Sequence, residues 1–355
     1  MKACGKEFLF IFLVHLLLLL FPFRSDAAAE TVLVVGTNEE IQTLSEAFEQ
    51  LPENSGDTRI LVQGNLTGEP NVSLSIPTNK GITSLTIENS AQDTPVTIEP
   101  VIEIFANGIP FVLGENVSLP NAWIFGGMLA INSTIRTVPQ TSLTILGSAA
   151  YVVGGGAANS GGRSVVTGST EVILGSQGIV FWQLFGGGYA LGKRSIAEIR
   201  ISNVEIFGKA DYVLGGGLAK ENGRTIVRER ANATINPGGS AAIALFGGGN
   251  AVGEGSISET EAANATIYGT AAWAFGGDFT FQGGQSLIPG TAEITVAESG
   301  SVNALYGGSF ATDKNSRSEV AKTVLNVAGS VGTVTSEGET SYEGVSVVSD
   351  PDRSF

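Results

Sequence analysis

Hydrophobic positions along this chain recur in a fixed relation to paired glycines. Seven times two apolar residues are followed directly by Gly-Gly, as in Ile124-Phe125-Gly126-Gly127. The first glycines of the seven pairs are Gly126, Gly154, Gly186, Gly215, Gly247, Gly276 and Gly307. The steps between them are 28, 32, 29, 32, 29 and 31 residues. A period near thirty residues is the signature of a repeat architecture in which each repeat is one supersecondary unit.

Each repeat contains three short apolar segments separated by polar or glycine-rich turns. In the unit that begins at Gly154, these segments are residues 164–167, 171–174 and 180–185. Strands of this kind fit one coil of a parallel β-helix, each stacked ~4.8 Å from its equivalent in the next coil. A β-propeller is the main alternative, but its blades need four strands in ~40–50 residues. We therefore predict an all-β, right-handed parallel β-helix solenoid, whose corner glycines permit positive φ and close approach of successive coils.

The residues before the regular array predict a capped beginning. Residues 31–36 predict a short strand, and residues 37–51 then change to a helical period. The apolar face of this predicted helix is formed by Ile41, Leu44, Phe48 and Leu51. Thr37 and Glu40 predict a capping box, and Pro52 ends the helix. We expect an N-terminal capping helix, because an open solenoid end exposes core and sheet edges.

The pattern divides the chain into four parts. Residues 1–29 form a leader segment, residues 30–125 hold the cap and the first irregular coils, residues 126–335 hold the regular array, and residues 336–355 form a polar tail. Strands in the irregular coils are predicted at residues 59–63, 72–76, 82–88, 96–104 and 109–113. The Gly-Gly expected near residue 336 is replaced by Ser336-Glu337-Gly338-Glu339. The tail is therefore either a degenerate last coil or the point where a longer protein is interrupted.

The leader segment predicts export. Lys2 and Lys6 precede an apolar run over residues 8–23, and three alanines at residues 27–29 offer a cleavage site, which is the pattern of a secretory signal peptide. Its removal takes away the only cysteine, Cys4, and the only histidine, His15. The mature chain then lacks the residues for disulfides, for Cys or His zinc sites, for Cys nucleophiles and for a Ser-His-Asp triad.

The charge balance limits the partners. The chain carries 19 Lys and Arg against 34 Asp and Glu, with a pI of about 4.5. Nucleic acid and anionic lipid are poor partners for such a surface. No membrane span is predicted after removal of the leader, and no cofactor is predicted. The expected location is secreted or at the cell surface.

The order of these elements resembles a known group of proteins. A helix over residues 39–51, strands at residues 59–64 and 80–87, and then repeated Phe-Gly-Gly coils resemble secreted bacterial right-handed β-helix proteins of pectin-lyase-like fold, often described as adhesin-like. In this fold, lyases use an Arg or Lys base and often Asp-bound Ca²⁺, and hydrolases use paired carboxylates. The aspartates of the mature chain do not align in adjacent coils, so we predict neither catalytic residues nor a metal site.

One column of the repeat is rich in aromatic residues. The residues three positions before the glycine pairs are Trp123, Tyr151, Gln183, Tyr212, Ala244, Trp273 and Ala304. Facing outward, Trp123, Tyr151, Tyr212 and Trp273 would form a strip suited to stacking on sugar rings. Facing inward, they would be core, which strand alternation with the adjacent Phe column favours. These four residues are candidate ligand-binding residues under the first interpretation.

A second column is basic. It consists of Arg163, Arg194, Arg224 and Arg317, which lie 8 to 10 residues after their first glycines. Such an edge could bind an acidic glycan. The alternative is a row of solvated turn charges paired with nearby glutamates.

The sequence thus predicts an exported, non-catalytic β-helix that acts as an adhesin-like surface or extracellular binding or spacer protein. Polysaccharide or a cell-surface glycan is the predicted partner, and self-association through the C-terminal end is a further possibility. The alternative function is a carbohydrate-active enzyme, either a polysaccharide lyase or a glycoside hydrolase, on the same scaffold.

Overall fold

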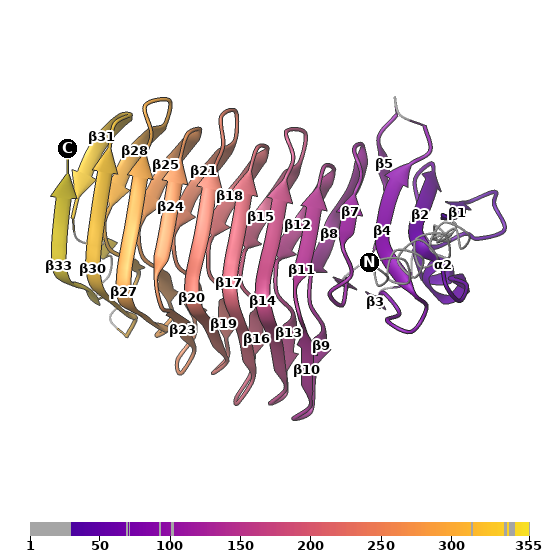
Figure 1. Cartoon of the computed structure of the whole chain (residues 1–355), viewed down its shortest axis with the longest axis horizontal. Helices are drawn as coiled ribbons and strands as arrows, with labels where there is room; N and C mark the ends of the chain where they lie inside the picture. The colour runs from indigo at the N-terminus through magenta and orange to yellow at the C-terminus, as the bar shows by residue number, and fades with distance from the viewer. Residues whose placement is uncertain are drawn as a thin grey trace, which may run out of the picture.

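The chain folds as a parallel β-solenoid of about ten turns with about 29 residues per turn. Successive coils stack along the long axis of the molecule, with the first coils at one end and the last at the other (Figure 1). The computed structural model describes residues 30–68, 70, 72–91, 94–100, 103–313, 315–336, 339–340 and 345–354. The predicted signal peptide, residues 1–29, lies outside them. The predicted all-β parallel β-helix is confirmed.

Three parallel sheets run along the solenoid. The first sheet contains β1 (Thr31–Gly36), β2 (Gly56–Gln63), β4 (Ile82–Asn89), β7 (Phe111–Leu113), β10 (Ile135–Val138), β11 (Thr141–Ile145), β14 (Arg163–Leu174), β17 (Ile196–Ile206), β20 (Arg224–Ile235), β23 (Ile257–Thr260), β24 (Ala263–Ile267), β27 (Gln285–Val296), β30 (Arg317–Val327) and β33 (Val345–Ser354). The second contains β3 (Ser73–Ser75), β5 (Val96–Thr97), β6 (Glu103–Phe105), β8 (Val117–Phe125), β12 (Ser148–Val153), β15 (Ile179–Phe185), β18 (Lys209–Leu214), β21 (Ser240–Phe246), β25 (Thr270–Phe275), β28 (Ser301–Tyr306) and β31 (Ser330–Thr335). The third contains β9 (Leu129–Ala130), β13 (Ala157–Asn159), β16 (Tyr189–Leu191), β19 (Leu218–Lys220), β22 (Asn250–Val252), β26 (Phe279–Phe281), β29 (Phe310–Ala311) and β32 (Glu339–Thr340).

The main core lies between the second sheet and the later half of each long strand of the first sheet. Its inward residues stack coil on coil, as Ile124, Val152 and Leu184 do on one side and Val172 and Val204 on the other. These side chains are at most 1% exposed. Burial of apolar surface at roughly 25 cal/mol per Å² is the main stabilising term for such a core.

A thin wing extends from this core. It consists of the third sheet and the earlier half of the long strands of the first sheet, for example β14 up to the register shift between Val166 and Ser169. Its inward ladder on the first sheet is made of small or polar residues, namely Ser164, Ala197, Thr225, Ser258, Ser286 and Ser318. Small side chains let the two layers of the wing approach closely.

The helix before the first coils is shorter than predicted. It spans α2 (Leu44–Gln50), and its N-cap is Thr43, whose Oγ1 accepts a hydrogen bond from the Glu46 backbone N–H at 3.1 Å. The Glu46 carboxylate accepts from the Thr43 N–H in return, which completes the capping box. The predicted helix start at Thr37 is wrong, because Gly36 N–H donates to the Ile41 carbonyl and closes a turn there.

The boundaries at both ends of the array also differ from the prediction. Residues 96–104 do not form one strand but contribute to β5 and β6, which both pair with β8. Beyond residue 336, where the polar tail was expected, β32 pairs with β29 and β33 pairs with β30. The coil pattern thus continues to Ser354. No helix of the described residues is both long and apolar enough to cross a membrane.

The glycine pairs stand where the second sheet turns into the third, and close approach is what requires them. A Cβ placed on Gly216 would lie 2.7 Å from the Gly249 nitrogen and 2.8 Å from its Cα. Positive φ occurs elsewhere, at turn tips such as Gly161, Gly192 and Gly253. Hydroxyls from across the core hold some of these corners, since Thr170 Oγ1 donates to the Gly186 carbonyl at 2.6 Å.

Replacing a corner glycine should therefore destabilise the solenoid. We expect Gly216→Ala to lower the free energy of unfolding by about 2 kcal/mol or more, because the added methyl group meets backbone atoms of the next coil. Denaturant unfolding followed by circular dichroism measures the change. Gly68→Ala is the control, since a Cβ at Gly68 meets nothing within 4 Å. Equal stability of the two variants would contradict this explanation of the glycine pairs.

Candidate functional site

The outer faces of the second and third sheets meet at an external angle, which we call the elbow. Ile124 faces the main core, so its neighbours Trp123 and Phe125 point to the outside of the solenoid. Phe125 is nevertheless fully buried, because outward side chains of the third sheet pack toward it. The angle is thus concave, and an apolar cluster separate from the main core fills it along the solenoid axis.

Three ladders of outward residues build the elbow. The second-sheet column consists of Glu103, Trp123, Tyr151, Gln183, Tyr212, Ala244, Trp273, Ala304 and Thr333. The floor column consists of Phe105, Phe125, Val153, Phe185, Leu214, Phe246, Phe275, Tyr306 and Thr335. The third-sheet column consists of Leu129, Ala157, Tyr189, Leu218, Asn250, Phe279 and Phe310. The register therefore places the four predicted aromatic residues in one ladder.

Aromatic rings stack along the floor of the elbow. Phe246 and Phe275 have ring centroids 4.8 Å apart with an interplanar angle of 8°, and Phe275 continues to Tyr306 at 4.7 Å. Rings from the third sheet join them, since Phe246 lies 5.4 Å from Phe279 and Phe275 lies 5.5 Å from Phe310. Stacked contacts of this kind stabilise aromatic clusters by about 0.5–1.5 kcal/mol per pair beyond area burial.

Trp123 and Trp273 occupy the same ladder but differ in environment. Trp123 stacks on Tyr151 with centroids 3.9 Å apart and contacts Tyr189 at 5.3 Å, so it is half-buried. Trp273 is 43% exposed and stands edge-on to Phe275 and Phe310, at interplanar angles of 69° and 89°. Trp273 is therefore turned across the stack, whereas Trp123 belongs to it.

Tyr189 is a member of the elbow that the spacing of the glycine pairs did not indicate. It lies in the third-sheet column, beside Trp123 and Phe125. Burial raises the pKa of Tyr189 to about 12, and the nearby carboxylates of Glu221 and Glu103 act in the same direction. The hydroxyl therefore stays protonated and remains a hydrogen-bond donor at all physiological pH values.

A bulge in β15 brings a third tryptophan to the surface. The pairing of β15 shifts between Val180 and Gln183, which leaves Phe181 and Trp182 pointing outward with exposed fractions of 40% and 56%. Ile243, at the matching irregularity of β21, is also exposed. We call Phe181, Trp182, Tyr212, Ile243 and Trp273 the outer strip. In the sequence, the bulge is marked by a polar residue, Gln183, which stands in the aromatic column directly after Trp182.

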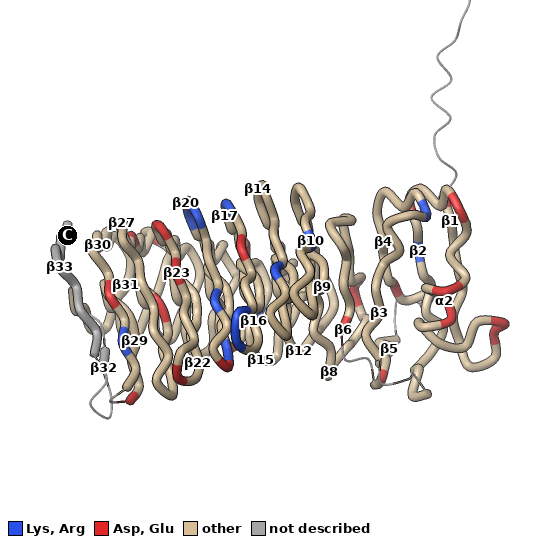
Figure 2. The backbone as a smooth tube through the Cα atoms, turned by 90° about the horizontal axis from the view of Figure 1, so that it is seen from below, with Lys and Arg blue, Asp and Glu red and all other residues tan. Residues whose placement is uncertain are grey.

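The basic residues lie on the opposite side of the wing from the elbow. Arg163, Arg224 and Arg317 share one ladder of the first sheet, but Arg194 does not, because it sits in an exposed turn with φ of 66°. Figure 2 shows Lys and Arg around β16, β17 and β20, with Asp and Glu among them.

Carboxylates engage the three arginines of that ladder. Arg163 pairs with Glu198 at 2.5 Å, Arg224 pairs with Glu259 at 2.6 Å, and Arg317 pairs with Glu319. Glu198 also accepts from Arg228 at 2.8 Å, and these guanidinium groups lower its pKa. The arrangement is that of paired surface charges, and such pairs contribute at most about 1 kcal/mol each.

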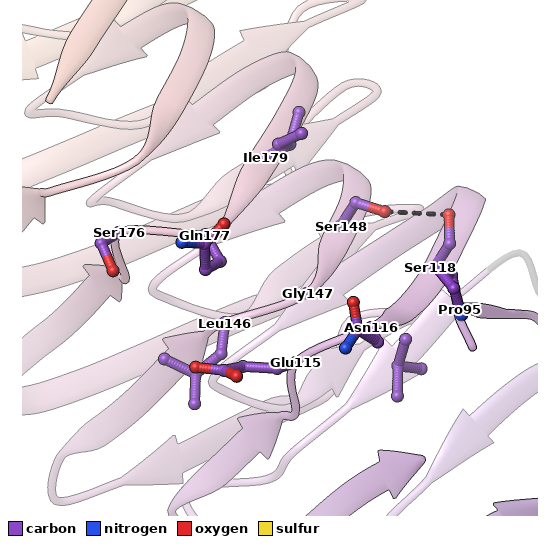
Figure 3. A pocket seen from close by; sticks show the side chains of 11 residues that line it. Pro95, Glu115, Asn116, Ser118, Leu146, Gly147, Ser148, Ser176, Gln177 and Ile179 are labelled. Carbon is purple, nitrogen blue, oxygen red and sulfur yellow. Dashed lines mark hydrogen bonds between the residues drawn. The ribbon is translucent and has the colours of Figure 1, made fainter. Parts of the chain in front are cut away.

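A polar furrow follows the corner between the first and second sheets in the early coils. One hollow of about 480 Å³ is lined by Glu115, Asn116 and Gln177, and by Ser118 and Ser148, whose hydroxyls lie 2.9 Å apart (Figure 3).

An adjoining hollow of about 570 Å³ shares Glu115 and Asn116 with the first and is also lined by Glu88. Glu88 forms an ion pair with Arg59. Two carboxylates thus line one hollow, although the described residues contain no group of three or more His, Cys, Asp or Glu that could hold a metal ion.

Asp278 is a fully buried acid next to the elbow. It takes the place that Gly249 holds in the preceding coil, and its Oδ1 accepts from the Gly249 N–H. Its Oδ2 has no hydrogen-bond partner in the described part of the chain, because the nearby Ser286 hydroxyl donates to Ser318 at 2.7 Å. Burial raises the pKa of Asp278 to about 7, although the hydrogen bond from the Gly249 N–H acts in the opposite direction.

The parallel β-solenoid agrees with the fold class that the resemblance implied. No protein-family model, no curated protein and no solved structure matches this chain. The fold serves enzymes and binding proteins alike. The chemistry of the elbow, the outer strip and the furrow therefore decides which function is favoured.

The buried Asp278 should make stability depend on pH. Its ordinary pKa is 3.8, so between about pH 4 and pH 7 the unfolded chain releases a proton that the folded chain keeps. Stability contributed by this group is present below pH 4 and is lost as pH rises through 7. We therefore compare the free energy of unfolding of Asp278→Asn with that of the wild type at each pH. From pH 4 to pH 8 this difference should move in favour of the variant by up to about 4 kcal/mol, since one pKa unit equals about 1.4 kcal/mol.

Unfolding midpoints of the wild type and Asp278→Asn across pH 4–8 measure this difference. Asp211→Asn, which removes the carboxylate of a partly exposed aspartate in β18, is the matched control for the loss of one negative charge. A constant difference between Asp278→Asn and the wild type over this range would show that Asp278 is not protonated in the folded protein.

Proposed function

We propose that this protein is an exported, non-catalytic, adhesin-like β-solenoid that binds polysaccharide or cell-surface glycan on the outer strip beside the elbow. The observation that carries the proposal is the exposure of Trp182 and Trp273, at 56% and 43%, on one face of the second sheet. Contiguous exposed apolar residues mark interaction sites on soluble proteins. Aromatic faces carry negative charge density, which attracts the polarised C–H groups of a sugar ring.

The repetition of the ladder suits a polymeric ligand. Trp182 and Trp273 lie in coils three steps apart, about 14 Å at ~4.8 Å per step, with Tyr212 and Ile243 in the two coils between. About ten turns make a rod of roughly 50 Å. A rod that presents similar side chains at a regular spacing can contact several units of a polysaccharide at once, and it can also serve as a spacer.

The charge distribution favours a neutral glycan. The aromatic and aliphatic residues of the outer strip carry no charge, and the arginines of the basic ladder are engaged by Glu198, Glu259 and Glu319. The predicted basic edge thus offers little free positive charge to an acidic glycan. Arg194, outside the ladder and exposed, is the exception among the four predicted arginines.

A carbohydrate-active enzyme is the second candidate function, favoured by one observation. Glu88 and Glu115 line the same hollow, and Arg59 pairs with Glu88, so two carboxylates and a guanidinium lie near one polar furrow. Paired carboxylates are the machinery of glycoside hydrolysis. The tryptophans are not among the residues that line the two hollows, and we therefore propose binding without cleavage as the primary function.

Export is part of the proposal and has its own test. We expect the full chain, expressed in a secreting host, to be recovered from the medium without residues 1–29, because that segment has the charge and apolar pattern of a signal peptide. The intact mass of the secreted protein measures this. A cytoplasmic product that keeps Cys4 and His15 would contradict export.

Glycan binding should depend on the two exposed tryptophans. We expect the secreted protein to bind neutral polysaccharides on a glycan array, and Trp182→Ala and Trp273→Ala each to weaken binding about tenfold, or about 1.4 kcal/mol, through loss of ring stacking. The control is Tyr268→Ala, an aromatic residue of similar exposure, 41%, that lies outside the strip.

Two outcomes would contradict the proposal. Undiminished binding by the double tryptophan variant would exclude the outer strip as the binding surface. Release of soluble sugar products by the wild type, abolished in Glu88→Gln or Glu115→Gln, would favour the enzyme instead.

A further inference from the structure

Two bulges of the second sheet flank a single acidic residue on its outer face. In β15, Phe181 and Trp182 lie between paired positions that β18 spans with Asp211 alone. In β21, Ala242 and Ile243 oppose the same residue from the other side. All four bulge residues are exposed, and Asp211 is partly exposed. Asp211 therefore lies in an open stretch of surface between two bulged strands that are two ladder steps, about 10 Å, apart.

The fold does not require a carboxylate at this position. The equivalent single residues opposite a bulge are Ala150 in β12 and Ala272 in β25. Aspartate is depleted in strands, and the Asp211 side chain has no hydrogen bond or ion pair among the residues that the structure describes. A residue that departs from the local pattern without a structural gain is typical of a functional site.

The same strand also supplies a hydrogen-bond donor. Lys209 lies two residues before Asp211 in β18, so strand alternation places both side chains on the outer face. Lys209 is exposed and has no ion pair within the described part of the chain. The Asp211 carboxylate accepts through two oxygens, and the Lys209 ammonium group donates through its three N–H groups. The two charges cancel, which suits an uncharged ligand whose hydroxyls both donate and accept.

We propose that Asp211, between the bulges of Trp182 and Ile243, forms a subsite for one neutral pyranose unit of the glycan. The sugar ring stacks against the exposed indole of Trp182, and two neighbouring hydroxyls donate to the Asp211 carboxylate. Lys209 donates to a further hydroxyl oxygen. Hydrogen bonds to charged groups are stronger and more directional than ring stacking, so they select among sugars. The inference rests on the proposed function and names the residue that selects the ligand.

An amino sugar is the alternative occupant of this position. Its ammonium group could lie between the Asp211 carboxylate and the electron-rich face of Trp182. The positive charge of Lys209 on the same strand opposes that arrangement, because like charges repel at short range. An acidic sugar is disfavoured in the same way by Asp211. The neutral sugar is the occupant that both side chains accept.

Removal of the carboxylate tests the subsite. Asp211→Ala introduces the residue that Ala150 and Ala272 provide in the equivalent coils, so the variant should fold with a thermal midpoint close to that of the wild type. Calorimetric titration with soluble glucose and mannose hexasaccharides should show affinity about tenfold weaker than that of the wild type, as should the array of neutral polysaccharides. The matched control is Glu205→Ala, which removes an exposed carboxylate from the first sheet and should leave binding unchanged.

O-methylated hexasaccharides separate hydrogen bonding from a general disturbance of the outer strip. They keep the sugar ring but lack the hydroxyl donors. Any steric cost of the methyl groups is common to both proteins, so the comparison isolates the hydrogen bonds to Asp211. The loss of affinity on O-methylation should be about tenfold smaller for Asp211→Ala than for the wild type.

The outcomes distinguish the subsite from the proposed function. Loss of binding in Trp182→Ala and Trp273→Ala, with full binding in Asp211→Ala, would overturn the subsite and leave the function standing. Absence of binding to every neutral hexasaccharide and polysaccharide by the wild type would overturn both. Tighter binding of a glucosamine hexasaccharide than of the neutral ones, lost in Asp211→Ala, would overturn the assignment of a neutral sugar.

Discussion

The close approach of successive backbones at the elbow is the constraint on which the rest of this structure depends. At each glycine pair the chain turns outward from the second sheet into the third, and a Cβ there would meet the next coil within about 3 Å, as at Gly216. Because glycine removes that obstacle, every coil turns at the same point. The residues before the pair then stack on both sides of the sheet: Ile124 and its equivalents into the core, Phe125 and its equivalents into the elbow.

This constraint explains why much of the fold could be predicted. A turn that tolerates no Cβ leaves a glycine pair in each of the seven coils of the regular array, so the amino-acid sequence alone reveals the period and the register of the columns. Features that no glycine pair indicates were missed by the sequence-based prediction or assigned to the wrong residues. The sequence offers the capping-box spacing twice, at Thr37 and at Thr43, and the helix starts after the second. The backbone hydrogen bond from Gly36 to Ile41, which no side-chain pattern reveals, closes a turn at the first. Arg194 shares the spacing of the other arginines, but a turn places it outside their ladder.

In the candidate site, too, the sequence predicted the alignment of residues but not their surroundings. The alignment of Trp123, Tyr151, Tyr212 and Trp273 followed from spacing, but their environments did not. Whether a ring is stacked, as Trp123 is, or turned across the stack, as Trp273 is, depends on side chains of other coils and of the third sheet. Trp182 reaches the surface through a bulge. An outward column that is still mostly buried was not anticipated, because it requires the concave angle between two sheets.

We expect a neutral glycan to lie against the exposed Trp182 and Trp273 of the outer strip, and not in the furrow of Glu88 and Glu115. A crystal structure of the secreted protein soaked with a neutral hexasaccharide tests this most directly. The expected result is a sugar ring stacked against Trp182 or Trp273, with the glycan chain running along the outer strip. A ligand seated instead in the furrow, between Glu88 and Glu115, would contradict it.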